Sequence, residues 1–121
     1  MASIKTLVNF NGTNGADPEA GLITDITGDL FGTTVQGGAN GLGTVFEIVK
    51  TAFGYASTPT VLFNFDNTHG ALPEAGLIAD AAGNLFGTTS GGGASFGTVF
   101  EIAGTTVVGV SPSSGSLFGH V

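Results

Sequence analysis

The sequence contains no cysteine and no tryptophan, and it has very few charged residues. Its 121 residues include two Lys or Arg and nine Asp or Glu, which gives a formal net charge of −7. The absence of cysteine excludes disulfides, thiolate metal sites and cysteine nucleophiles. Binding to nucleic acid is not expected, because phosphate contacts need clustered Lys and Arg side chains. An anionic membrane surface is not an expected partner for the same reason.

Long apolar runs are also missing. No stretch approaches the roughly 18 apolar residues of a membrane-spanning helix, so membrane insertion is not expected. Residues 1–5 lack the apolar run of about 7–15 residues that a signal peptide needs, so the chain as given is expected to be soluble, without an export signal. Charged residues make up 9% of the chain, against about 25% in an ordinary domain. Much of the surface must therefore be uncharged.

The chain consists of two diverged copies of one repeat of about 54 residues. Residues 7–48 align with residues 62–102 after one deletion near Asn40, and 28 of the 41 aligned positions are identical. The shared motifs are Pro-Glu-Ala-Gly-Leu-Ile, Leu-Phe-Gly-Thr-Thr, Gly-Gly-Ala and Gly-Thr-Val-Phe-Glu-Ile, which begin at residues 18, 30, 37 and 43 in the first copy and at 73, 85, 92 and 97 in the second. Such a period is typical of repeat architectures.

Each repeat is predicted to form four short strands. In the first copy the runs rich in β-branched and aromatic residues are 21–25, 30–35, 44–49 and 60–65, each bounded by turn residues. Several of these runs are apolar on both faces, so each four-stranded sheet is expected to be covered on both sides. Radial repetition of such sheets is the β-propeller solution. The predicted fold is all-β and propeller-like, with two four-stranded antiparallel blades per chain, completed by homo-oligomerisation.

The order of strands at the chain ends supports this completion. Residues 6–10 match residues 61–65, the last strand of the first blade, yet they precede it. We therefore predict a displaced strand in residues 1–10, which completes a blade formed by another part of the same chain or by another chain. The first blade then spans residues 11–66, the second 67–110, and a tail 111–121. A disordered arm is the alternative interpretation of residues 1–10.

The motif Gly-x-Leu-Phe-Gly-Thr-Thr, followed by Gly-Gly-Ala and Gly-Thr-Val-Phe-Glu-Ile, resembles the bacterial tandem repeat of the Gloeobacter–Verrucomicrobia type, the GloVer repeat. This resemblance implies a propeller-like fold and an extracellular or cell-surface location, and it brings no catalytic residues. Residues 106–115 are similar to the start of an IPT/TIG domain. Alternatively, residues 115–119 echo residues 83–87 and the tail is a degenerate third repeat. With either interpretation residues 107–110 can form a strand.

Residues that could carry catalysis are few. The two histidines, His69 and His120, have no counterpart in the other repeat, and the serines in residues 111–116 lack a paired base. The carboxylates recur in pairs, namely Asp25 with Asp80, Glu19 with Glu74, and Glu47 with Glu101. Recurrence favours structural roles, because catalytic acid and base need different environments. Asp25 and Asp80 precede tight turns, where they are expected to accept backbone N–H groups. No catalytic residue is assigned.

Metal and cofactor sites are not assigned either. Residues 11–19 place oxygen ligands at alternating positions, which suggests a hard cation such as Ca²⁺, but the second copy has Leu72 where the first has Asp17. An ordinary turn rich in Asn and Asp is the favoured interpretation. Gly32 and Gly87 lie in mid-strand, where a side chain is expected to meet the neighbouring sheet.

The sequence favours a noncatalytic structural module that associates with itself, in three or four copies, into a closed propeller. One alternative is a carbohydrate-binding module, in which neutral loops with an aromatic residue such as Tyr55 or Phe96 bind neutral glycans. The other is an open head-to-tail filament, which forms when the contact between chains does not close. These three interpretations stay open at the level of sequence.

Overall fold

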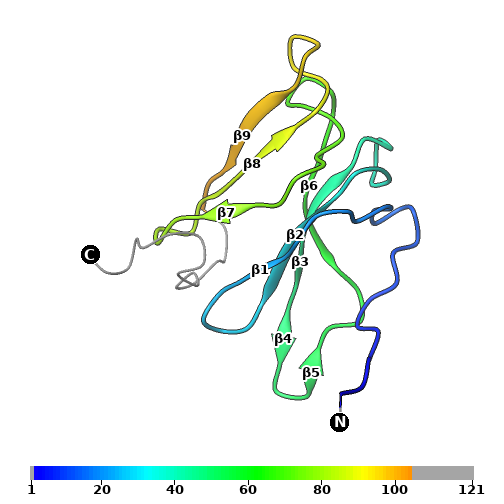
Figure 1. Cartoon of the computed structure of the whole chain (residues 1–121), viewed down its shortest axis with the longest axis vertical. Helices are drawn as coiled ribbons and strands as arrows, with labels where there is room; N and C mark the ends of the chain where they lie inside the picture. Colours follow the sequence, from blue (N-terminus) through cyan, green and yellow to red (C-terminus); the bar gives the residue numbers. More distant parts are fainter. Residues whose placement is uncertain (1, 105–121) are drawn as a thin grey trace.

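The structure, a computed structural model, describes residues 2–104, and the regular structure in this range is entirely β. Three antiparallel sheets have the strand orders β1-β2-β3-β6, β4-β5 and β7-β8-β9 (Figure 1). The strands are β1 (Ile23–Thr24), β2 (Leu30–Thr34), β3 (Thr44–Ile48), β4 (Lys50–Thr51), β5 (Gly54–Tyr55), β6 (Thr60–Asn64), β7 (Ile78–Ala79), β8 (Leu85–Thr89) and β9 (Thr98–Ile102). The all-β prediction is confirmed.

The four strands predicted for the first repeat form the first sheet, β1-β2-β3-β6, each within the predicted run. The second sheet, β7-β8-β9, repeats the register of β1-β2-β3 residue for residue. It has three strands among the described residues, so four strands are confirmed for the first repeat only. The strand predicted at residues 107–110 lies outside the described residues. The β4-β5 hairpin was not predicted, because its two-residue strands carry no alternating pattern.

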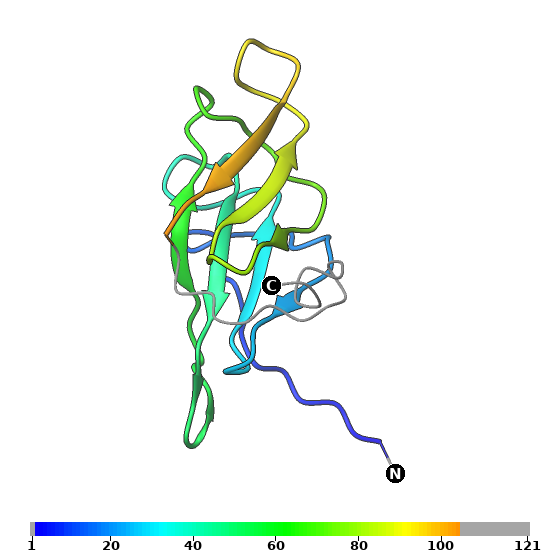
Figure 2. The same cartoon turned by 90° about the vertical axis from the view of Figure 1, so that its left-hand side faces the viewer.

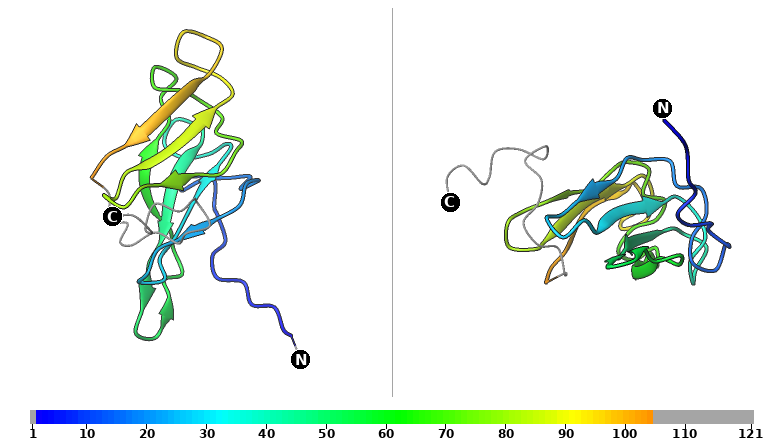
Figure 3. Two further views of the ribbon diagram at one scale, coloured as in Figure 1. Left: turned by 60° about the vertical axis from the view of Figure 1, so that its left-hand side comes forward. Right: turned by 90° about the horizontal axis from the view of Figure 1, so that it is seen from below.

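The predicted displaced strand is not a strand in the single chain. Residues 6–10 have no ladder partner, and the chain before them extends away from both sheets (Figure 3). A β-strand needs a neighbouring strand to satisfy its backbone N–H and C=O groups. The segment contacts the first sheet through side chains instead: Leu7 and Val8 lie beside Leu22 and Ile48, and the ring of Phe10 packs edge-on against Phe46 with centroids 5.0 Å apart.

The two faces of each main sheet differ in composition, and we name them after one residue each. The valine face of the first sheet carries Ile23, Phe31, Thr33, Val45 and Glu47, and in the second sheet its counterparts are Ile78, Phe86, Thr88, Val99 and Glu101. The glycine face carries Leu22, Leu30, Gly32, Phe46 and Ile48, and its counterparts are Leu77, Leu85, Gly87, Phe100 and Ile102.

The core forms where the valine face of the first sheet packs on the glycine face of the second. Phe31 and Val45 lie in one buried cluster with Leu77, Ala79 and Leu85, and the second sheet crosses the first in Figure 2. Two hydrogen bonds join the repeats at this interface. The Leu72 N–H donates to the Leu42 carbonyl at 2.9 Å, and the Thr33 hydroxyl donates to the Ala75 carbonyl at 3.3 Å. Unlike faces of the two repeats therefore meet.

A threonine pair lies at the loop end of each long hairpin, buried in the first repeat and part-buried in the second. The hydroxyls of Thr34 and Thr44 lie 2.7 Å apart, and those of Thr89 and Thr98 lie 2.8 Å apart. Thr34 also donates to the Gln36 carbonyl at 3.0 Å and accepts from the Thr44 N–H at 3.1 Å. Because these bonds satisfy buried hydroxyls, they explain why the second Thr of Leu-Phe-Gly-Thr-Thr recurs together with the Thr of Gly-Thr-Val-Phe-Glu-Ile.

The structure corrects one expectation about the mid-strand glycines. An added Cβ at Gly32 would lie 2.8 Å from Cζ of Phe46, and one at Gly87 would lie 2.6 Å from Cζ of Phe100. Both phenylalanines are cross-strand partners in the same sheet, so the side chain would not meet the neighbouring sheet as predicted. The ring folds over the glycine and fills the space that its missing side chain leaves, an arrangement known to compensate glycine in sheets.

Gly87→Ala is therefore expected to destabilise the chain, because Phe100 must move away from its edge-on contact with the buried Phe65, at 5.1 Å between centroids. Overpacking of this kind costs about 1–3 kcal/mol. The matched control is Gly21→Ala, where an added Cβ meets nothing within 4 Å. Urea denaturation should show the loss for Gly87→Ala and little change for Gly21→Ala. Equal stability of the two variants would contradict this assignment.

Candidate interaction faces

The valine face of the second sheet is uncovered, although its counterpart in the first sheet is buried. Val45 is 0% exposed, whereas Val99 is 83% exposed. Ile78, on β7, is 57% exposed, and Thr88 and Glu101 are also exposed while Thr33 and Glu47 are buried. The residue types are the same in both repeats, so the difference in exposure depends on what lies against each face. The second sheet packs on the valine face of the first sheet, and none of the described strands packs on the valine face of the second. Exposed apolar patches are a common feature of interaction sites, which makes this face a candidate.

The glycine face of the first sheet is open only in part, because Phe46 and Ile48 are 3% and 4% exposed while Leu22 lies largely in water. Leu22 is 54% exposed, whereas its counterpart Leu77 is 4% exposed. Leu7, Val8 and Phe10 lie along this face and enclose with it a hollow of about 280 Å³. In the second repeat the corresponding space is filled by Leu62, Phe63 and Phe65 and by the valine face of the first sheet. The hollow is thus an incomplete copy of the buried core.

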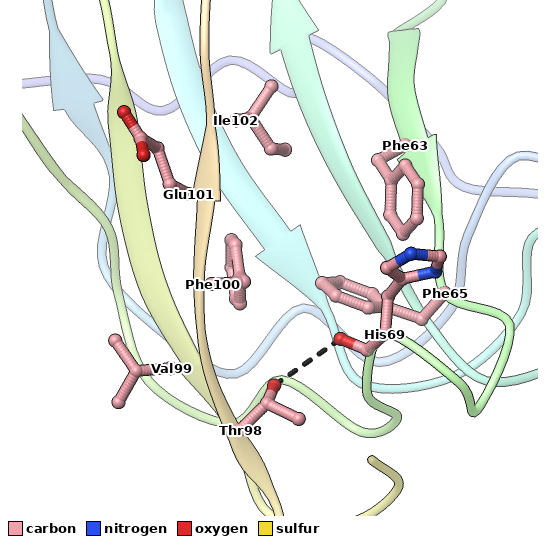
Figure 4. A pocket seen from close by; sticks show the side chains of 8 residues that line it. All are labelled: Phe63, Phe65, His69, Thr98, Val99, Phe100, Glu101 and Ile102. Carbon is pink, nitrogen blue, oxygen red and sulfur yellow. Dashed lines mark hydrogen bonds between the residues drawn. The ribbon is translucent and has the colours of Figure 1, made fainter.

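A third open feature is the cleft beside the free edge of β9. This cleft, of about 310 Å³, lies between β9 and the end of β6, and it is lined by Phe63, Phe65, His69, Thr98, Val99, Phe100, Glu101 and Ile102 (Figure 4). Phe100 and Ile102 point toward Phe63 and Phe65, while Val99 and Glu101 point to the opposite side of the strand. In the first sheet the equivalent edge, that of β3, is paired with β6.

His69 is held in a turn rather than aimed at a ligand. Its ring Nδ1 lies 2.8 Å from Oδ2 of Asp66, and its backbone N–H donates to Oδ1 of Asp66 at 2.8 Å. These two bonds to His69 lower the pKa of Asp66 below its ordinary value. In the first repeat Asn11 and Asn14 replace this pair, and each accepts the other's backbone N–H. His120 and the serines 111–116 lie outside the described residues.

Asp25 and Asp80 accept hydrogen bonds in their own turns, as the sequence predicted. Oδ1 of Asp25 accepts from the N–H groups of Thr27 and Asp29 at 3.1 and 3.0 Å. Oδ1 of Asp80 accepts from those of Ala82 and Asn84 at 3.0 and 2.9 Å. The backbone and side-chain N–H groups of Asn84 lower the pKa of Asp80. Both carboxylates therefore fix hairpins.

The remaining recurrent acids are not brought together in a metal site. Within residues 2–104 no group of three or more Asp, Glu or His side chains is arranged to hold a metal ion. The loop at residues 11–19 uses its Asn side chains within the turn, which confirms the expected turn rich in Asn and Asp. Glu74 accepts a hydrogen bond from Ser90 at 3.2 Å, and Glu19 is exposed. Glu47 is buried, whereas its counterpart Glu101 is exposed.

The two aromatic residues considered for glycan binding differ in availability. The hydroxyl of Tyr55 donates to the Gly28 carbonyl at 2.8 Å, and its ring lies 5.7 Å from Nζ of Lys50, so Tyr55 fastens the β4-β5 hairpin to the first sheet. Phe96 is 95% exposed on the loop between β8 and β9. Glycan binding stays a prediction.

The uncovered faces could not be assigned from the sequence, because the two repeats carry the same residues at these positions. One signal was available: a repeat whose faces are both apolar needs a neighbour on each side, and an array of two leaves one face open at each end. Which face is open at which end depends on how the sheets stack. The chain is accordingly an all-β repeat protein whose two main sheets expose unlike faces.

Comparison with known families agrees with this class. The sequence matches the family described as Gloeobacter/Verrucomicrobia repeat over residues 1–118, so the chain belongs to this family. Comparison with curated proteins found no match, and comparison with solved structures found none either. In the described part of the chain no helix has the length and apolar character needed to cross a membrane.

Asp80→Asn is expected to lower the melting temperature at pH 7, because an amide cannot accept the second hydrogen bond from the Asn84 side chain at 3.0 Å. The pKa of Asp80 lies below the ordinary 3.8 when the chain is folded. Its stabilising contribution is therefore present above about pH 4 and is lost as the pH falls through the folded-state pKa. The difference between the two proteins should shrink toward zero in acid.

Thermal melts from pH 7 to about pH 2 measure this dependence. Asp17→Asn is the control, since it removes the same charge from an exposed side chain. A difference between Asp80→Asn and the parent that stays constant with pH would refute the role of the ionised carboxylate.

Proposed function

We propose that the chain is a noncatalytic structural module that assembles with copies of itself into a closed β-propeller of three or four chains. The observation that carries the proposal is the complementarity of its two open faces. The valine face of the second sheet and the glycine face of the first have the same residues as the two surfaces that meet in the core, except that Thr24 stands where the second sheet has Ala79. Each chain therefore displays both halves of an interface that it already contains.

The contact between chains repeats the contact within the chain. A second copy that places its glycine face on the exposed Val99 and Ile78 covers them as Leu77, Leu85 and Phe100 cover Val45 and Ile23. The association is heterologous, because different surfaces of the two copies meet, and such contacts form rings when the rotation closes. Two sheets per chain give six or eight blades for three or four copies, within the usual range of about four to eight.

The surface chemistry supports a structural role. Among the carboxylates that recur, Asp25 and Asp80 are used in turns and Glu47 and Glu101 lie along strands. The loop at residues 11–14 bonds within itself. With two basic residues in 121, the chain has little means of binding anions. We place the assembly outside the cell or at its surface, on the strength of the family resemblance.

Ile78→Asn is expected to weaken assembly without unfolding the chain. Ile78 is 57% exposed in the single chain, but in the assembly its replacement would bury an amide without a partner, which costs about 1–3 kcal/mol. The dissociation constant between chains should rise about tenfold or more. The matched control is Ile26→Asn, in the turn after β1, where the isoleucine is 74% exposed and outside both faces.

Native mass spectrometry of the parent and the two variants tests the proposal. The parent and Ile26→Asn should have the mass of three or four chains at micromolar concentration, and Ile78→Asn should dissociate while its circular dichroism spectrum is unchanged. A monomeric parent would contradict self-assembly. An unlimited series of masses would instead indicate an open filament.

A further inference from the structure

We infer that residues 5–10 of one copy form the missing fourth strand beside β9 of a second copy, in a defined register. This inference rests on the proposed self-assembly and adds the strand, its acceptor edge and the pairing of residues. It starts from the free edge of β9, where the cleft of Figure 4 opens. None of the strands formed within residues 2–104 pairs with this edge.

The first sheet shows which kind of strand pairs with the equivalent edge. There β3 is paired with β6 through Thr44 with Asn64, Val45 with Phe63, Phe46 with Val61 and Glu47 with Thr60, with a bulge between Val45 and Phe46. β9 has the same sequence as β3, Thr-Val-Phe-Glu-Ile. An acceptor strand identical in sequence to β3 is expected to select a strand that resembles β6.

Residues 7–10, Leu-Val-Asn-Phe, resemble residues 62–65, Leu-Phe-Asn-Phe, and they already occupy the equivalent place against their own sheet. The ring of Phe10 meets Phe46 at 5.0 Å and 64°, and the ring of Phe65 meets Phe100 at 5.1 Å and 67°. The N-terminal segment is thus seated on the first sheet as the end of β6 is seated on the second. The segment lacks a neighbouring strand to pair with, the role that β3 has for β6.

A second copy can supply that strand and at the same time cover the open faces by the stacking that the chain shows internally. When the valine face of one copy's second sheet lies on the glycine face of the next copy's first sheet, β9 comes beside residues 5–10 of the next copy. The register of β3 and β6 then places Asn9 opposite Thr98, Val8 opposite Val99, Thr6 opposite Phe100, and Lys5 opposite Glu101.

Charge favours this register. Lys5 is one of two basic residues in the chain, and it falls opposite Glu101, which is exposed in the single chain. The corresponding position in β6 is the neutral Thr60. Opposite charges directly across a ladder stabilise pairing, and like charges weaken it. A pair of Lys5 with Glu101 therefore favours residues 5–10 over a strand like β6, which has Thr60 at this position, as the partner of β9.

The test is a cross-link between chains in the full-length protein. Directly opposed residues in an antiparallel ladder have Cα atoms about 4.5–5.5 Å apart, within the range of about 4.4–6.8 Å that a disulfide spans. The parent has no cysteine, so the two introduced residues of the variant Val8→Cys with Val99→Cys are the only thiols that can form a disulfide. Mild oxidation followed by denaturing, nonreducing electrophoresis should give covalent multimers up to the size of the ring.

The control for register is Val8→Cys with Glu101→Cys, in which Glu101 lies two residues along β9 from the position opposite Val8, and the pair should cross-link at least tenfold less. A disulfide within one chain would show that the segment pairs with its own β9 and would overturn the inference. Absence of the cross-link in a variant of normal oligomeric mass would overturn strand addition and leave self-assembly standing. A monomeric parent would refute both.

A charge reversal gives an independent readout. Lys5→Glu and Glu101→Lys should each raise the concentration of half-assembly about fivefold per interface, and the double variant should restore the parent value. Lys50→Glu, which changes the same net charge on β4, is the control and should assemble normally. Failure of the double variant to recover, with both single variants impaired, would contradict the pairing of Lys5 with Glu101.

Discussion

The packing of one sheet's valine face on the next sheet's glycine face is the interaction on which the rest of the structure depends. Phe31 and Val45 meet Leu77, Ala79 and Leu85 there, and these five residues with Phe65 form the buried cluster between the sheets. Each sheet is only a few strands wide and apolar on both faces, so a single sheet could not keep its surface out of water. Stacking buries one pair of faces, and it also makes the two ends of the chain different.

The repeat motifs follow from this stacking. Gly87 allows the ring of Phe100 to fold flat over the strand, which smooths the surface that receives Phe31 and Val45. The threonine pairs satisfy the polar groups at the hairpin ends, and Asp25 and Asp80 hold the turns between the first two strands of each repeat. Each identical position therefore serves a local geometry that every sheet in an array needs, which is why these positions recur in both copies.

The same logic connects stability with association. A chain of two repeats has one internal interface and two open faces, and in a repeat protein a large share of stability resides in interfaces between neighbours. The isolated chain leaves Val99, Ile78 and Leu22 in water, although their counterparts are wholly or largely buried. Association of the open faces would add, for every chain, one interface formed by nearly the same residue types as the internal interface. In such an assembly, fold stability and association would depend on the same kind of interface.

The sequence by itself determined the repeat, the strands of the first sheet and the Asp turns, because these depend on spacing, β propensity and local hydrogen bonds. Only the tertiary structure decided which face of each sheet is covered, since Val45 and Val99 occur in identical motifs and differ only in what lies against them. It also showed that Gly32 and Gly87 accommodate rings of their own sheet, and that residues 6–10 lack a ladder in the single chain. Which face is covered, where the rings lie and which strands pair all depend on residues distant in sequence. A local sequence pattern carries no information about these distant contacts.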